Sequence, residues 1–192
     1  MTSAVDGLKQ RFMDMSQPDA DGVYRDGAAK RKARTDLAMD CLKQLWQEAC
    51  QTVSFDVPQS GIGLGTVGSL ARGQVGPSSD LDLVVIYEPH ALTDQQLNEL
   101  ANKLWYPIWD SGLDLDQSVR TRAQCEAVTD HDLPAAMGWL DVVPIAGDCK
   151  PQDETLDVEW VNPNSEILDT FINQMSNGYG TIVRQAIAWA GR

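Results

Sequence analysis

A stretch of closely spaced glycines, followed by an apolar run, constrains this chain more than any other feature. Six glycines fall between residues 61 and 76, and the run Leu81-Asp82-Leu83-Val84-Val85-Ile86-Tyr87 comes next. Glycine permits tight turns, whereas β-branched residues at this density are typical of a strand. We therefore expect a first strand at 62–67, a tight turn at 67–69 and a second strand at 81–87.

Helical periodicity frames these strands on both sides. Apolar residues recur at three- and four-residue spacing across 37–49, which predicts an amphipathic helix. Thr93, with Gln96 three residues later, forms a capping-box pattern at the start of a second helix. This helix should reach the region of Trp105 and Trp109, whose helical spacing predicts that both lie in the core.

The rest of the chain adds further predicted elements. We expect a strand in the alternating segment 113–120, a helix capped by Thr121, a helix beginning at Pro134, a short strand or loop at 142–146, and helices at 167–175 and 181–189. Strands separated by helices indicate an α/β (α+β) fold, with a small mixed β-sheet, helices packed on it, and flanking N- and C-terminal helices. We divide the chain into an N-terminal helical segment (1–56), a core (57–150) and a C-terminal helical extension (151–192).

Charge excludes several classes of function. The 192 residues include 15 Lys and Arg against 28 Asp and Glu, a formal net charge of -13. Because a chain this acidic repels polyanions, we expect no nucleic-acid partner, and we expect the basic run 30–34 to lie on a solvated helix face. No segment approaches the roughly 18 consecutive apolar residues of a membrane span, so we expect no membrane partner.

The four cysteines follow neither a zinc-site nor a disulfide pattern. They are Cys41, Cys50, Cys125 and Cys149, scattered and without a Cys-x-x-Cys pair, and the chain has two histidines. We expect reduced, mostly buried thiols. The N-terminus lacks the basic region and apolar run of a signal peptide, and the expected location is the cytoplasm.

The glycine pattern permits two interpretations, of which the first is dinucleotide binding. The segment 63–68 matches the Gly-x-Gly-x-x-Gly fingerprint, and Asp80 and Asp82 come after it. That fingerprint needs an apolar strand before it and a helix after it. Here Pro58-Gln59-Ser60 precedes the glycines, and further glycines and a proline at 73–77 would break a helix at that place. The context therefore argues against this interpretation.

The second interpretation joins the turn at Gly68-Ser69 to the two acids at the start of the next strand. Alternate strand residues point the same way, so Asp80 and Asp82 would present two carboxylates side by side to hard cations such as magnesium. Two such ions can clamp a triphosphate and activate an attacking hydroxyl. Gly68 would let the backbone approach a phosphate, and the Ser69 hydroxyl and amide could hydrogen-bond to it.

The predicted strand at 113–120 supplies candidates for a third carboxylate. A third acid on a neighbouring strand usually completes a site of this kind. Asp114 and Asp116 alternate with leucines, so both would lie on one face of the strand. The sequence pattern does not decide whether Asp114 or Asp116 is the third carboxylate.

Together, these features resemble the DNA polymerase beta-like nucleotidyltransferase superfamily. The resemblance is carried by Gly68-Ser69-Leu70-Ala71-Arg72-Gly73-Gln74 and by Pro77-Ser78-Ser79-Asp80-Leu81-Asp82-Leu83. A second block, 104–112 with Ser118-Val119-Arg120-Thr121, is similar to the N-terminal catalytic domain of bacterial PII-protein uridylyltransferases from high-GC Gram-positive bacteria. The resemblance covers about 61–148, roughly half of the chain.

This resemblance implies a reaction and a set of site residues. UMP would pass from UTP to a tyrosine of the PII nitrogen-regulatory protein, pyrophosphate would leave, and two Mg2+ ions would assist. The implied metal-binding catalytic residues are Asp80, Asp82 and Asp114, with Asp116 in reserve. The implied nucleotide-binding residues are Gly68, Ser69, Arg72 and Ser79. Gln117, Ser118 and Arg120 are further candidates, with Arg120 neutralising charge or bracing the sheet.

The chain departs from the family pattern in places, and two alternatives stay open. Family members usually carry Gly-Gly where this chain has Gly68-Ser69, and usually carry His where Gln117 stands; Gln can hydrogen-bond but cannot hold a proton. With two histidines, the HD hydrolase and ACT domains of the full-length family are not expected here. The alternatives are adenylylation from ATP, and a catalytically silent module that binds nucleotide or PII. Retention of both Asp80 and Asp82 argues against the silent module.

Overall fold

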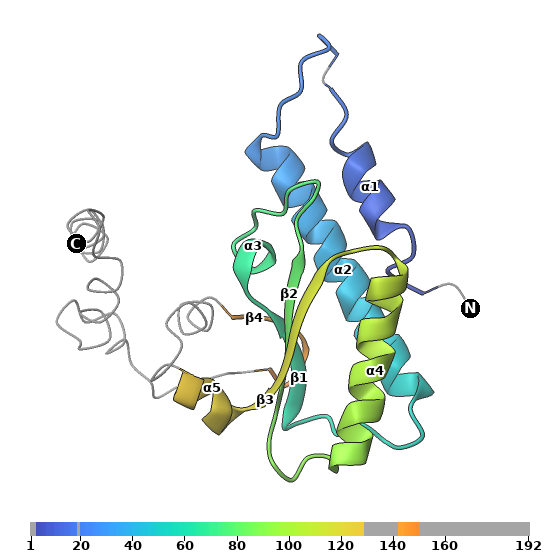
Figure 1. Cartoon of the computed structure of the whole chain (residues 1–192), viewed down its shortest axis with the longest axis vertical. Coiled ribbons are helices and arrows are strands. Elements are labelled where there is room, and N and C mark those ends of the chain that lie inside the picture. Colours follow the sequence, from blue (N-terminus) through green and yellow to red (C-terminus); the bar gives the residue numbers. More distant parts are fainter. Residues whose placement is uncertain (1–2, 19, 129–141, 150–192) are drawn as a thin grey trace, which may run out of the picture.

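A four-stranded mixed sheet forms the centre of the protein (Figure 1). The computed structural model describes residues 3–18, 20–128 and 142–149. The strands are β1 (Ile62–Thr66), β2 (Leu81–Tyr87), β3 (Leu115–Thr121) and β4 (Val143–Gly147), in the spatial order β3-β2-β1-β4. β1 is antiparallel to both β2 and β4, and β2 is parallel to β3.

Two long helices cover one face of this sheet. They are α2 (Ala28–Thr52) and α4 (Asp94–Asp110), and α1 (Leu8–Asp14) lies alongside them (Figure 1). Two short helices complete the described elements: α3 (Gly68–Ala71), directly after β1, and α5 (Arg122–Val128), directly after β3. The N-terminal helices and the sheet share one hydrophobic cluster, so α1 and α2 belong to the same core as the strands.

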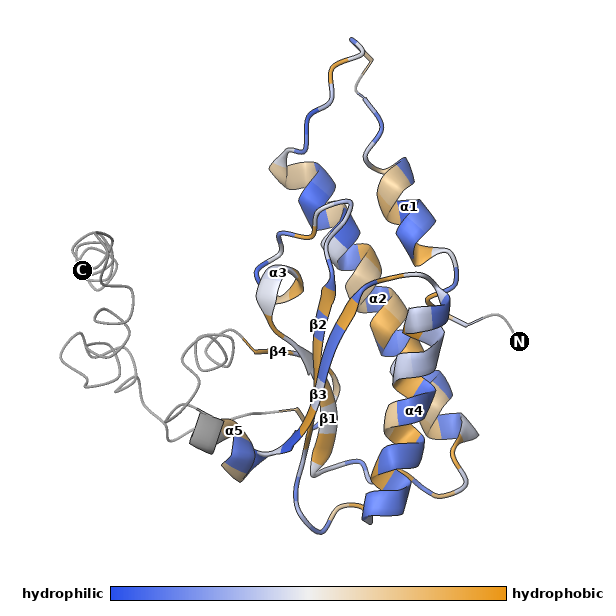
Figure 2. Cartoon of the chain, viewed as in Figure 1, coloured by the Kyte–Doolittle hydropathy of each residue, from blue (hydrophilic) through white to orange (hydrophobic). Residues whose placement is uncertain are grey.

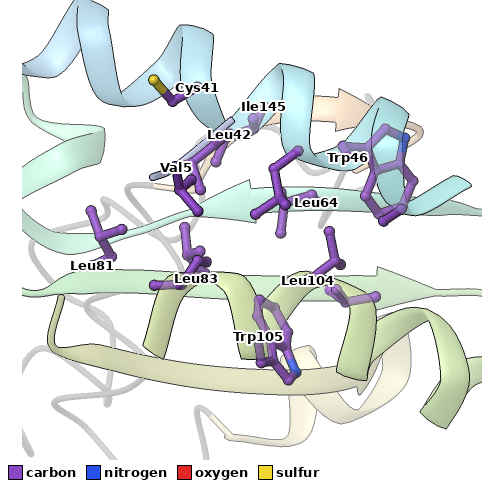
Figure 3. Close-up of a cluster of buried hydrophobic side chains, with 14 of the residues drawn as sticks. Val5, Cys41, Leu42, Trp46, Leu64, Leu81, Leu83, Leu104, Trp105 and Ile145 are labelled. Carbon is purple, nitrogen blue, oxygen red and sulfur yellow. The ribbon is translucent and has the colours of Figure 1, made fainter. Parts of the chain in front are cut away.

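Alternation along β2 sends its side chains to two different environments. Leu81, Leu83 and Val85 join the main core beneath α2 and α4, which Figure 3 shows around Leu83. Val84 and Ile86 point to the opposite face and pack in a second cluster with Cys125 and Cys149. Figure 2 accordingly shows β2 as largely hydrophobic. Asp82 lies between Leu81 and Leu83, and therefore belongs to the face away from α2 and α4.

The local signals in the sequence are largely confirmed. The strands at 62–67 and 81–87 form, and the segment 142–146 forms β4. Thr93 caps α4: Gln96 N donates to Thr93 Oγ1 at 3.3 Å, and Thr93 N donates to Gln96 Oε1 at 3.0 Å. Thr121 forms the same reciprocal pair with Gln124 at the start of α5. The cysteines are free, and three of the four are buried.

Two sequence predictions are wrong. Trp105 is buried, but Trp109 is 44% exposed and its ring meets that of Tyr106 edge to face. The buried stripe of α4 runs through Leu104, Trp105 and Ile108, and position 109 falls at its edge. The basic run 30–34 does not lie wholly on a solvated face, because the Arg34 side chain is fully buried. Its guanidinium is taken up by partners from two loops, which helical periodicity cannot anticipate.

Some predictions lie outside the described residues. These are the helix expected at Pro134, the helices at 167–175 and 181–189, and the extension at 151–192, so the division into three segments stays a prediction. No helix in the described part of the chain combines the length and the apolar character needed to cross a membrane.

Candidate active site

The end of β1 is fastened to the start of β2 at Asp82. The antiparallel register places Thr66 opposite Leu83. Val67 N donates to the Asp82 carbonyl at 3.1 Å, and the hydroxyl of the fully buried Thr66 donates to the same carbonyl at 2.8 Å. The turn after β1 is thereby held beside the Asp82 carboxylate. Sequence reasoning missed Thr66, whose only signal is a lone hydroxyl in a strand of apolar and glycine residues.

Gly68 is required by its contact with Asp82. Its φ of 65° lies in the left-handed region, and a Cβ added there would overlap Asp82 Oδ2. The sequence interpretation explained this glycine by close approach of a phosphate. The structure gives a different reason, since the space that a side chain would fill holds the carboxylate.

Glycines 63 and 65 have a separate role. They lie inside β1, where a Cβ on Gly63 would stand 2.5 Å from the backbone nitrogen of Cys149 and a Cβ on Gly65 would stand 2.6 Å from the Cys149 sulfur. They allow the segment after β4 to pass close over β1. This packing accounts for the fingerprint-like spacing without a dinucleotide.

Ser69 presents a buried hydroxyl beside this turn. Within the described residues, no group hydrogen-bonds to Ser69 Oγ. The Ser69 carbonyl accepts from Gln74 N at 2.8 Å, which folds the chain after α3 back onto the turn. A buried hydroxyl without a partner is costly, and an acceptor group of a ligand would relieve that cost.

The strand register brings a third carboxylate next to Asp82. β2 and β3 are parallel, with Asp82 opposite Asp116. Paired residues of parallel neighbours point to the same face, so the two carboxylates lie side by side. Asp114 precedes β3, and its carbonyl accepts from Leu81 N at 2.9 Å. The register therefore favours Asp116 over Asp114 as the neighbour of Asp82.

The electrostatics of Asp82 reflect this crowding. Burial raises the pKa of its carboxyl above the usual value, and the negative charges of Asp80 and Asp116 raise it further. Arg72, just after α3, acts in the opposite direction and lowers this pKa. Because Asp80, Asp116 and Arg72 all act on this pKa, their side chains lie close enough to the Asp82 carboxyl to belong to the same site.

The other predicted site residues are divided between two faces. Ser118 pairs with Val84 and Arg120 with Ile86, so both lie on the Asp82 face, further along β3. Gln117 pairs with Leu83 and points to the other face, so the structure separates it from the carboxylates. Ser79 Oγ accepts from Gly76 N at 2.8 Å and so closes the turn before Asp80.

A divalent cation fits the chemistry of these carboxylates. In the described part of the chain, no three Asp, Glu, His or Cys side chains converge as ligands of one ion. Mg2+ usually takes one or two carboxylates and completes its shell with water and substrate phosphates, so a protein cage is not needed. Asp82, with its like-charged neighbours, is the kind of oxygen donor that such an ion would stabilise.

Two families match parts of the chain. The nucleotidyltransferase domain family matches residues 42–134, which include β1, β2, β3 and the acidic site. A domain of unknown function (DUF4916) matches residues 125–192, most of which lie outside the described residues.

Several curated relatives are similar to the same region. Each is named a bifunctional uridylyltransferase/uridylyl-removing enzyme. The one from Streptomyces coelicolor is 38% identical over 124 residues, 65% of this chain and 14% of the relative. The one from Corynebacterium glutamicum is 39% identical over 129 residues (67% and 17%), and one from Pseudomonas putida is 33% identical over 131 residues (66% and 14%). The chain thus spans about one sixth of these relatives or less. Over residues 42–134, it belongs to the nucleotidyltransferase domain family.

Proposed function

We propose that this chain transfers UMP from UTP to a tyrosine of a PII signalling protein. The observation that carries the proposal is that the turn at Gly68 lies against the Asp82 carboxylate, which pairs with Asp116 across the sheet. The next residue in this turn is Ser69, whose buried hydroxyl has no hydrogen-bond partner among the described residues. The named activity of the relatives supports the choice of a uridylyl group. The free cysteines fit a reducing compartment, and we propose the cytoplasm as the location.

The proposed reaction is a displacement at phosphorus. The tyrosine oxygen forms a bond to the α-phosphorus of UTP while the bond from that phosphorus to the bridging oxygen breaks. Pyrophosphate leaves with that oxygen, and the hydroxyl proton passes to solvent. The charge of the triphosphate must be offset for this to happen. Because several carboxylates gather around Asp82, magnesium would supply most of that neutralisation.

The residues of the chain divide this work. Asp80, Asp82 and Asp116 would hold the magnesium, with Asp114 as the alternative third ligand. Ser69 would donate to a phosphate oxygen, for which its hydroxyl is available. Arg72, which lies close enough to Asp82 to influence its pKa, would neutralise phosphate charge.

The direct test is the intact mass of a PII protein after incubation with this chain, Mg2+, and either UTP or ATP. We expect a gain of one UMP with UTP, and no gain with Asp80→Ala or Asp82→Ala. The matched control is Asp40→Ala, which removes an exposed carboxylate from α2, on the opposite side of the sheet.

Each other outcome decides between alternatives. A gain of one AMP with ATP alone would assign adenylylation. Nucleotide binding without any mass gain would favour the silent binding module. Transfer that survives in Asp82→Ala would refute the role given to this carboxylate.

A further inference from the structure

Arg34 is the one fully buried charged side chain among the described residues. Its Nε donates to the Val75 carbonyl at 2.8 Å and its Nη1 donates to Ser16 Oγ at 3.0 Å. Its Nη2 forms a short ion pair with the carboxylate of Asp26. One guanidinium on α2 thus joins the connection between α1 and α2 to the loop between α3 and β2.

That loop connects two parts of the candidate site. It runs from Arg72 to Ser79, between the Ser69 turn and Asp80. Gln74 N donates to the Ser69 carbonyl at 2.8 Å, and the next residue, Val75, is the acceptor for Arg34. Arg31, one helical turn before Arg34, donates from Nε to Gln74 Oε1 at 2.7 Å. Helix α2 therefore fixes two consecutive residues of the loop.

An arginine at position 34 is unexpected, because the position lies in the buried stripe of α2. Position 34 continues the buried stripe of α2, with Ala38, Leu42 and Leu45 further along. An apolar residue would fill such a position at lower cost, because burying a charge carries a desolvation penalty that its partner often fails to repay. The planar guanidinium carries several donors in fixed directions, so it can make defined contacts with three partners in two loops, which an apolar side chain cannot.

We propose that Arg34 is a positioning residue for the loop 72–79, and through it for Ser69 and Asp80. The proposal rests on the function proposed above. Arg34 touches no substrate; it holds the backbone at Val75, so that Gln74 can hold Ser69. Asp26 compensates the buried charge, which makes the connection between α1 and α2 part of the support of the site.

The test uses Arg34→Met and Arg34→Lys, with Lys32→Met as the matched control. Lys32 lies on the same helix, is exposed, and pairs with Asp36 at 2.7 Å. Lys keeps the charge opposite Asp26 but has a single nitrogen, so Arg34→Lys should fold and still lose the loop contact. Amide hydrogen exchange of Gln74 is measured by NMR in each variant, together with the amides of Val84 and Val85 in β2.

We expect Gln74 exchange to quicken about 10- to 100-fold in both Arg34 variants, the factor that corresponds to loss of a hydrogen bond from a charged donor. Exchange at Val84 and Val85 should stay unchanged, and Lys32→Met should match the unaltered protein throughout. In the transfer assay, kcat/KM should fall about 10- to 100-fold through a higher KM for the nucleotide.

Two results would overturn the inference. Unchanged Gln74 exchange in Arg34→Lys would show that the loop does not depend on the guanidinium. Equal acceleration of Gln74, Val84 and Val85 would show that Arg34 serves only overall stability. The exchange measurement needs no activity, so it decides the role of Arg34 even if the chain transfers no nucleotide.

Discussion

The carboxyl group of Asp82 lies where its charge is disfavoured. Burial raises its pKa above the usual 3.8, and Asp80 and Asp116 add to the effect. The carboxyl group of Asp82 therefore binds its proton more tightly in the folded state than in the unfolded chain. At a pH above the raised pKa the group is ionised in both states, and its charge then lowers the stability of the folded state. Without metal, we expect Asp82→Asn to increase the free energy of unfolding at pH 7 by about 0.2–1 kcal/mol, because solvent screens the repulsion at this partly exposed group.

The pH dependence of this gain distinguishes it from a general effect of the substitution. As the pH falls through the raised pKa of Asp82 toward 3.8, the unaltered carboxyl becomes neutral and the difference between the two proteins should shrink. Urea unfolding between pH 4 and pH 8 measures this, with Asp40→Asn as the control. A gain that is the same at every pH would contradict the explanation.

A comparison of Gly68 with Gly73 separates two reasons for a glycine, the left-handed backbone and the lack of space for a side chain. Both have φ near 65–69°, but an added Cβ meets Asp82 at Gly68 and nothing within 4 Å at Gly73. We expect Gly73→Ala to cost about 1–2 kcal/mol for the left-handed backbone alone. Gly68→Ala should cost about 1–3 kcal/mol more, because the methyl group displaces the carboxylate. Thermal unfolding of both variants measures the difference, and equal losses would show that Gly68 is needed for its backbone only.

At the scale of elements, one side-chain hydroxyl adds to the backbone contact between the end of β1 and the start of β2. Thr66 Oγ1 and Val67 N share the carbonyl of Asp82. We expect Thr66→Val, which keeps the volume, to quicken amide exchange of Val67 about 2- to 10-fold through loss of that hydrogen bond. Thr66→Ser keeps the hydroxyl and should leave this exchange unchanged, although its missing methyl lowers stability. Equal exchange of Val67 in both variants would show that the Thr66 hydroxyl does not help to hold the turn beside Asp82.

Helices and strands with a strong local pattern could be predicted from the sequence. The contacts that these elements make with distant segments could not. The apolar run of β2 and the capping box at Thr93 each determine a local structure through neighbouring residues. The choice between Asp114 and Asp116 depends on the register of β3 against β2, which no local pattern encodes. Burial of Arg34 depends likewise on Val75, 41 residues away. Contacts between distant segments thus account for most of what the sequence left open.

At the scale of the whole molecule, the helices before β1 and the sheet form one core. Phe12 of α1 is fully buried in the same cluster as Leu42 of α2 and Leu64 of β1. A shared core implies cooperative unfolding, because loss of packing on one side exposes apolar surface on the other. The predicted boundary near residue 57 would then separate segments of the chain but not units of stability.

Substitution of Phe12 tests this cooperativity. Phe12→Ala should cost about 3–5 kcal/mol, since a fully buried aromatic side chain leaves a cavity. If the core is one unit, the free energy of opening obtained from slow amide exchange should fall by the same amount in β1 and β2 as in α2. Met13→Ala, at the exposed neighbouring position on α1, should change neither. Faster exchange confined to α1 and α2, with β1 and β2 still protected, would instead show that the helices unfold separately from the sheet that carries the candidate active site.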